Sequence, residues 1–79
     1  MYHTITMKLG AKLKERRLAR GLLQKDVAKE IGISREFYVK IELGKQEPRH
    51  ATLVALADFF EVSTDYLLGR EDEFGNPIK

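Results

Sequence analysis

The chain has 79 residues, of which 43% are hydrophobic and 33% charged, and it contains no cysteine. This length fits one small domain and is too short for an enzyme of ordinary size, and the lack of cysteine excludes disulfides and thiolate zinc sites. No apolar run approaches the roughly 18 residues that a membrane span requires. We therefore expect a single folded domain in the cytoplasm.

Charge is divided unevenly along the chain. Residues 8–49 hold 12 Lys and Arg against 6 Asp and Glu, whereas residues 50–79 hold 2 against 6. A basic segment of this size is typical of a protein that binds a phosphate backbone, although many small domains are basic without such a partner. The acidic run at 71–73 stands beside turn-forming residues, so we predict that residues 70–79 are an acidic, flexible tail.

The first helix is predicted over residues 7–20, after an N-terminal arm of residues 1–6. Leu9, Leu13 and Leu18 fall on or near one helical stripe, and basic residues occupy most other positions. We expect this stripe to face the core.

The second helix is predicted to begin at Gln24 and to end at Gly32, with Val27, Ala28 and Ile31 facing inward. Residue 23, at its N-cap, is a leucine, although Ser, Thr, Asp or Asn there would add about 1 kcal/mol. An Asp in the first turn offsets part of this loss. The helix is therefore expected to form despite its weak cap.

A third helix is predicted over residues 35–43. Ser34 is a good N-cap, and Ile33 and Tyr38 stand at the two positions of a hydrophobic staple. Only three residues separate this helix from the one before it. The two helices are therefore joined by a tight turn.

A fourth helix is predicted over residues 50–61, because Leu53, Leu56, Ala57 and Phe60 repeat at intervals of three and four. A short fifth helix follows, with Ser63 as its cap and Tyr66 and Leu67 as its apolar residues. No segment alternates with the period of a strand. The sequence predicts an all-α domain of five short helices over residues 7–69.

The second and third helices have the sequence form of a helix-turn-helix, with Ala28 small at their contact and Gly32 in the turn. In DNA-binding versions the second of the two helices enters the major groove, which is about 12 Å wide. The third helix is then the reading helix. Its outward residues are predicted to be Arg35, Glu36, Phe37, Val39 and Lys40, while Tyr38 and Ile41 return to the core.

These features resemble the phage-repressor and Cro family of helix-turn-helix regulators, also called XRE-like. The resemblance covers residues 9–69 and rests on the order and spacing of several elements: Leu9-Gly10, Leu13, Arg17, Gly21, the block 24–33, Ser34, the stretch 41–45, Pro48, Val62-Ser63 and 65–69. It implies a compact five-helix, lambda-repressor-like domain that binds double-stranded DNA as a dimer on a palindromic operator. Leu23, Leu43 and Arg49 depart from the family pattern.

Each outward residue of the third helix has two interpretations. Arg35 would reach guanine O6 and N7 with two hydrogen bonds, or contact phosphate only. Glu36 favours the positive helix N-terminus and would accept from cytosine N4 in a less favoured interpretation. Phe37 either packs on thymine methyl groups or is partly buried. Val39 and Lys40 lie one turn later, and Lys40 is also placed to meet phosphate.

Four further residues are predicted to contact the DNA backbone: Gln24, Ser34, Lys45 and Arg49. By resemblance, Gln24 touches a phosphate or braces the reading helix; the alternative is a solvated glutamine. Arg49 would enter a narrow minor groove. Ordinary surface charge is the alternative for Lys45 and Arg49.

The resemblance also implies a structural ion pair between Arg17 and Glu42. It places a dimer interface near the last two helices, for which we name Phe59, Thr64 and Tyr66. Core packing is the alternative role of Phe59.

Nothing in the inventory of residues favours an enzyme. The two histidines are isolated, no metal-ligand cluster or glycine-rich phosphate loop is present, and no cofactor or effector-binding domain is expected. The sequence thus predicts a DNA-binding transcriptional regulator, with repression favoured. A protein-interaction module of the same fold, such as an antitoxin-like or anti-repressor partner, is the alternative, because Phe37, Val39 and Leu43 are apolar on the outward side.

Overall fold

The computed structural model describes the backbone of residues 4–70 and the side chains of residues 8–70. Helices are the only regular secondary structure in this part of the chain. The helices are α1 (Thr4–Ala19), α2 (Gln24–Ile31), α3 (Arg35–Glu42), α4 (His50–Phe60) and α5 (Thr64–Leu67). None of the helices within residues 4–70 is both long and apolar enough to cross a membrane.

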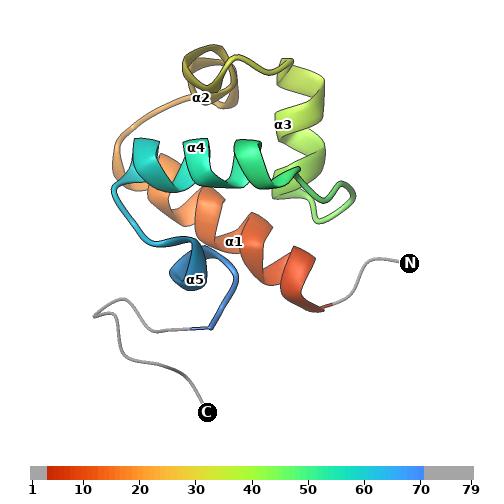
Figure 1. Ribbon diagram of the computed structural model, residues 1–79. Helices are drawn as coiled ribbons and strands as arrows, with labels where there is room; N and C mark the ends of the chain where they lie inside the picture. The colour runs from red at the N-terminus through yellow and green to blue at the C-terminus, as the bar shows by residue number, and fades with distance from the viewer. Residues whose placement is uncertain (1–3, 71–79) are drawn as a thin grey trace.

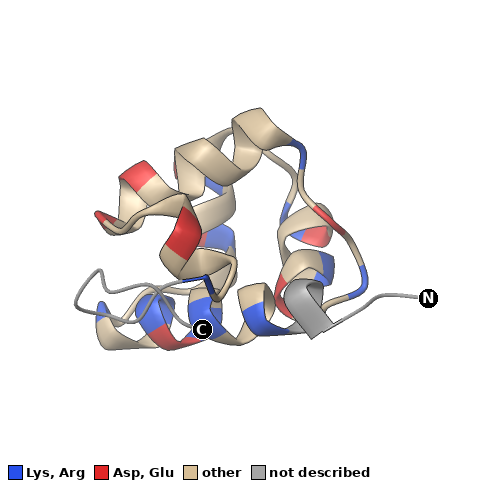
Figure 2. Ribbon diagram, turned by 60° about the horizontal axis from the view of Figure 1, so that its bottom comes forward, with Lys and Arg blue, Asp and Glu red and all other residues tan. Residues whose placement is uncertain are grey.

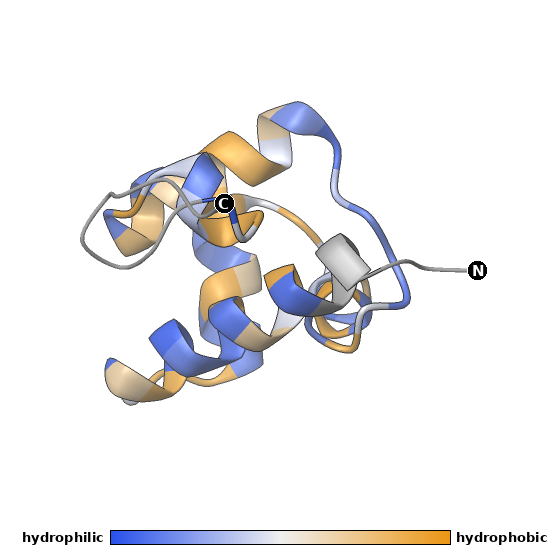
Figure 3. Cartoon of the chain, turned by 90° about the horizontal axis from the view of Figure 1, so that it is seen from below, coloured by the Kyte–Doolittle hydropathy of each residue, from blue (hydrophilic) through white to orange (hydrophobic). Residues whose placement is uncertain are grey.

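The helices enclose a single core (Figure 1). α1 packs against α3 and α5, α2 packs against α3 and α4, and α4 packs against α5. Hydrophilic and hydrophobic residues alternate along α1 in Figure 3, because only one side of that helix meets the core. The buried apolar residues come from all five helices: Leu9, Leu13, Val27, Ala28, Tyr38, Ile41, Leu53, Leu56, Ala57, Phe60, Tyr66 and Leu67.

The five-helix, all-α prediction is confirmed. The largest difference from the predicted helix bounds is at the start of α1. α1 begins at Thr4 instead of residue 7, so residues 4–6 of the predicted arm are helical. α4 ends at Phe60 because Glu61 adopts the left-handed conformation, with φ 56°. The predicted tail, except for Arg70, and the first three residues of the predicted arm lie outside the described residues.

The placement of Leu18 on the core stripe of α1 is wrong, since its side chain is 56% exposed. Leu18 follows Leu13 by five residues, and at 3.6 residues per turn this rotates it about 140° away from Leu13. Leu9 and Leu13 are buried as predicted. Leu18 therefore belongs to the solvent side of the helix.

The α2–α3 turn is built as its sequence predicts. Gly32 adopts φ 82°, and the amides of Gly32 and Ile33 both donate to the carbonyl of Ala28. The Ser34 hydroxyl accepts a hydrogen bond from the Phe37 amide at 3.0 Å and caps α3. The turn thereby fixes where α3 starts.

The weak cap of α2 is offset by its first turn. Leu23 has no side chain that could accept a hydrogen bond, but the Asp26 carboxylate accepts one from the Leu23 amide at 2.8 Å. A negative charge in the first turn of a helix also interacts favourably with the helix dipole. Asp26 thus supplies part of the N-cap stabilisation that Leu23 cannot provide.

Gly10 brings α1 close to the end of α3. A side-chain carbon at this position would lie 2.8 Å from the carbonyl oxygen of Ile41 and would also meet the backbone of Glu42. Only glycine therefore permits this close approach of the two helices.

Candidate nucleic-acid interface

α3 has one buried side and one solvent side. Tyr38 and Ile41 are fully buried and attach the helix to the core. The opposite side carries Arg35, Glu36, Lys40 and Leu43, all exposed, with Val39 half-buried among them. We call these five residues the outward face of α3.

A shallow groove runs along the outward face. Besides those five residues, Gln24 from the start of α2 and Lys45 from the loop after α3 line it. Three cations, Arg35, Lys40 and Lys45, therefore stand around one carboxylate, Glu36. The groove combines net positive charge with apolar surface, which is the chemistry of a DNA major-groove reader.

Phe37 does not join the outward face. Its ring is half-buried and packs against the core, so of its two interpretations the structure supports partial burial. It lies two residues after Arg35, which turns it about 200° around the helix axis. A ring held in this way has little surface left for thymine methyl groups.

The predicted backbone contacts surround the outward face unequally. Ser34 is exposed, but its hydroxyl already accepts the Phe37 amide. Lys45 and Arg49 are both exposed. Arg49 occupies the N-cap position of α4 with an extended backbone, and its side chain makes no capping hydrogen bond. Its guanidinium is therefore not needed to hold that helix end.

Arg17 and Glu42 meet behind α3. Arg17 Nε donates to Glu42 Oε2 at 2.7 Å, and Arg17 Nη2 donates to Oε1 at 3.1 Å. Arg17 Nη1 also donates to the Leu22 carbonyl at 2.9 Å. The side chains are only 9% and 3% exposed. The pair therefore ties α1 to the end of α3 and to the loop before α2.

The Glu42 carboxylate stays ionised inside this contact. Burial acts to raise its pKa, but the surrounding hydrogen bonds, that of Arg17 first, and the positive charge of Arg17 together outweigh burial, so the pKa lies below its ordinary value of 4.5. The Arg17 pKa is raised, chiefly by its hydrogen bond to Glu42. Both groups are therefore charged at neutral pH.

Gln24 connects this pair to the groove. It is half-buried, and its Nε2 donates to Glu42 Oε1 at 3.2 Å. Gln24 also lines a second hollow with Arg35, beside the start of α2. This geometry agrees with a bracing role for Gln24 rather than with a solvated glutamine.

Tyr38 lies at the same junction with its hydroxyl buried. Within the described residues, this oxygen has no hydrogen-bond partner. Burial, followed by the adjacent Glu42 carboxylate, raises the Tyr38 pKa. The hydroxyl is therefore neutral, and the ring serves mainly as core.

The residues named for a dimer interface differ in exposure. Phe59 is half-buried, meets Phe60 edge to face with ring centroids 4.9 Å apart, and lies under the Arg20 guanidinium. Thr64 is half-buried at the start of α5. Tyr66 is only 5% exposed, so it has little surface to offer a partner.

The Tyr66 ring is covered by α1. Lys12 Nζ lies 4.5 Å from the ring centroid, and the Arg16 guanidinium lies 4.9 Å from it. Cations above an aromatic face attract its quadrupole. These contacts explain why Tyr66 faces inward, and spacing in the sequence alone did not reveal them.

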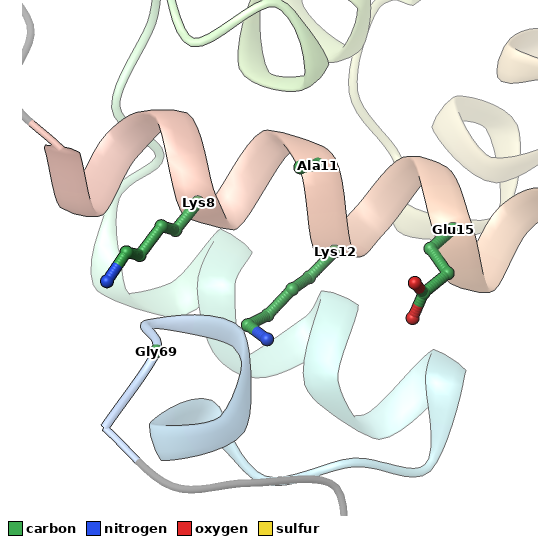
Figure 4. Close-up of a pocket in the computed structure, with 5 residues that line it drawn as sticks. All are labelled: Lys8, Ala11, Lys12, Glu15 and Gly69. Carbon is green, nitrogen blue, oxygen red and sulfur yellow. The ribbon is translucent and has the colours of Figure 1, made fainter. Parts of the chain in front are cut away.

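Another hollow lies between α1 and the end of α5, away from the outward face (Figure 4). Lys8, Ala11, Lys12, Glu15 and Gly69 line it. Lys and Arg recur along the coloured part of α1 in Figure 2, so positive charge also extends to this side of the molecule. The outward face of α3 is therefore not the only basic surface.

Comparison with known proteins agrees with this geometry. Residues 13–67 match the helix-turn-helix family HTH_3. The chain belongs to this helix-turn-helix family. The match includes the buried Leu13 of α1, the α2–α3 unit and all of α5.

Relatives of this helix-turn-helix chain include a protein named as an SPbeta prophage-derived HTH-type transcriptional regulator, YonR of Bacillus subtilis. The two are 44% identical over 59 residues, which cover 75% of this chain and 55% of YonR. The chain spans about half the length of the curated relatives that it matches first. Those relatives therefore contain further sequence outside the matched region.

Solved structures show the same fold. The restriction-modification controller protein C.AhdI of Aeromonas hydrophila superposes with a TM-score of 0.75 at 26% identity, covering 82% of this chain and 98% of that protein. The P22 c2 repressor, solved in complex with a synthetic operator, gives 0.72 at 29% identity, covering 75% and 89%. Both are regulators with the helix-turn-helix arrangement described above.

Leu43 lines the groove of the helix-turn-helix unit, although the sequence predicts it as outward apolar surface and not as a DNA contact. It is 60% exposed. Leu43 follows Glu36 by seven residues and Val39 by four. Helical periodicity alone was enough to place it on the outward face.

Within the described side chains, no group of three or more His, Cys, Asp or Glu is placed to hold a metal ion. The relatives are named as transcriptional regulators.

Proposed function

We propose that this helix-turn-helix chain is a sequence-specific, double-stranded DNA-binding transcriptional regulator that represses by occupying an operator. The names of its relatives support regulation, and the operator complex of the P22 c2 repressor supports DNA as the ligand. Its cytoplasmic location stays a prediction.

One observation carries the proposal. α3 is held by Tyr38 and Ile41, whereas its opposite side exposes Arg35, Glu36 and Lys40 to solvent. A helix presented in this way, at the second position of a helix-turn-helix, fits the major groove and exposes donors and acceptors to base edges. Arg35 is the residue best suited to guanine.

Binding to the backbone follows from the charges around the groove. We assign phosphate contacts to Lys45 and Arg49, which are exposed and lie on the loop between α3 and α4. Gln24 would contribute by holding the end of α3 in place. Each phosphate contact adds a slope of about −0.9 to the dependence of log affinity on log salt.

The proposal includes a homodimer on a palindromic site. Phe59 and Thr64 are the residues assigned to its interface, because both keep solvent-accessible surface at the junction of α4 and α5. Tyr66 contributes only from beneath that surface. Half-sites of such a dimer lie about 34 Å apart, one turn of DNA.

Selection of bound duplexes from a random pool tests the proposal. We expect an inverted repeat with half-sites about one helical turn apart, bound with steep salt dependence. Arg35→Ala should relax one base position of that repeat. Lys14→Ala, which changes an exposed cation on a different helix, α1, is the matched control. Recovery of no preferred sequence would contradict specific binding.

A second candidate is a protein-interaction module of the same fold. The exposed Leu43 beside Val39 favours it, because apolar surface on a recognition face also suits a protein partner. A gel-shift titration against random duplex at low salt separates the two functions. Absence of any retained complex at micromolar protein would favour the interaction module.

A further inference from the structure

The centre of the outward face of α3 is partly apolar. Glu36, Val39, Lys40 and Leu43 are spaced i, i+3, i+4 and i+7, so they form one stripe along the helix. Leu43 is 60% exposed, and Val39 lies one turn before it on the same side. Half of the stripe therefore consists of aliphatic side chains.

Neither aliphatic side chain is required by the fold. The core of the helix is made by Tyr38 and Ile41, and the helix end is held by Glu42. Leu43 keeps most of its side chain in water, which is unfavourable until a partner covers it. Covering it is therefore a source of binding free energy available to whatever enters the groove.

Within a major groove, one base offers an apolar group at its edge. Thymine carries a C5 methyl group there, whereas the other bases present hydrogen-bond donors and acceptors at the major-groove edge. Phe37, the residue first considered for this contact, is turned toward the core. The aliphatic part of the stripe is the remaining surface of α3 that can pack against a methyl group.

We propose that Val39 and Leu43 read thymine by contacting its methyl group, so that the operator half-site carries thymine opposite the second turn of α3. This inference rests on the proposed function, since it requires α3 to lie in the major groove. It specifies which bases the helix selects, in addition to a guanine opposite Arg35. Leu43 is thus a specificity-determining residue.

Uracil provides the test, because it pairs like thymine and lacks only the methyl group. Each thymine of a selected operator half-site is replaced singly by uracil, and affinity is measured by fluorescence anisotropy. We expect one or two positions to lose affinity by about fourfold, the effect of removing one buried methyl group. At one or more of those positions, Leu43→Ala should bind thymine and uracil equally well.

Two variants serve as controls. Leu18→Ala makes the same chemical change at a leucine with 56% exposure on α1, away from the groove, and should keep the full preference for thymine. Lys45→Ala should weaken binding to both operators by the same factor, because a phosphate contact does not distinguish them.

The outcomes separate this inference from the proposed function. If no duplex is bound at low salt, DNA binding itself fails, and the inference fails with it. If an operator is bound with no sensitivity to uracil, or if Leu43→Ala keeps that sensitivity at every position, thymine reading by Leu43 is overturned while DNA binding stands. Unchanged affinity of Leu43→Ala for the operator overturns it likewise.

Discussion

Replacing Arg17 by methionine tests the buried ion pair behind α3. The change removes three hydrogen bonds and leaves the Glu42 carboxylate, whose side chain is 3% exposed, with only Gln24 as a partner at 3.2 Å. An uncompensated buried charge of this kind costs about 3–5 kcal/mol. The free energy of unfolding of a domain of this size is about 4–12 kcal/mol, so the variant should be only marginally stable.

Urea denaturation followed by far-ultraviolet circular dichroism measures this loss. Combining Arg17→Met with Glu42→Met should recover most of the stability, because a buried ion pair and a well-packed apolar pair differ little in free energy. Lys14→Met, an exposed cation on the same helix, should change the unfolding free energy by less than about 0.5 kcal/mol. The reasoning is refuted if Arg17→Met costs less than about 1 kcal/mol, or if the double variant is no more stable than the single one.

Four further predictions follow from the structure. The pKa of Glu42 in the folded protein lies below 4.5, so the carboxylate stabilises the fold above that pH and loses this effect as pH falls through its folded pKa. In Glu42→Gln, the free energy of unfolding should therefore fall less steeply as pH is lowered. Arg35→Ala should lose about 1–3 kcal/mol of binding free energy on the selected operator and little on random duplex. Lys45→Ala should weaken binding to both duplexes alike and reduce the salt slope by about 1. Equal losses from both variants would contradict base reading. Glu61→Gly should raise the unfolding free energy by about 0.5–1 kcal/mol, because φ 56° strains any residue with a side chain, and a lower melting temperature would contradict this. Gly10→Ala should lower stability by about 1–3 kcal/mol in the same urea assay, since the added carbon meets the backbone of α3, and a gain from alanine's better helix propensity would refute the crowding.

Local chemistry was sufficient to predict most of the fold from the sequence. Ser34 and Ser63 cap their helices as expected, and Gly32 takes the left-handed conformation that its position required. The apolar periodicity of α4 identified its buried residues correctly. Signals of this kind act within one turn of helix, so they do not depend on tertiary contacts.

The candidate site was harder to predict because it depends on rotation and on neighbours. Phe37 was predicted on the outward side, but its ring packs against the core, whereas Leu43 is exposed as predicted and also lines the groove. Tyr66 is covered by cations of α1, which lie about 50 residues away in the sequence. Composition could not indicate the orientation of Phe37 or the cations above Tyr66.

Glu42 supports α3 without being part of its outward face. Its side chain holds Arg17 and Gln24, and its backbone presses on Gly10. Among the described residues, by contrast, the side chains of Arg35, Glu36, Lys40 and Leu43 form no hydrogen bond or ion pair. Those four side chains can therefore be exchanged at little expense to folding, whereas a change at position 42 alone leaves Arg17 without its ion-pair partner.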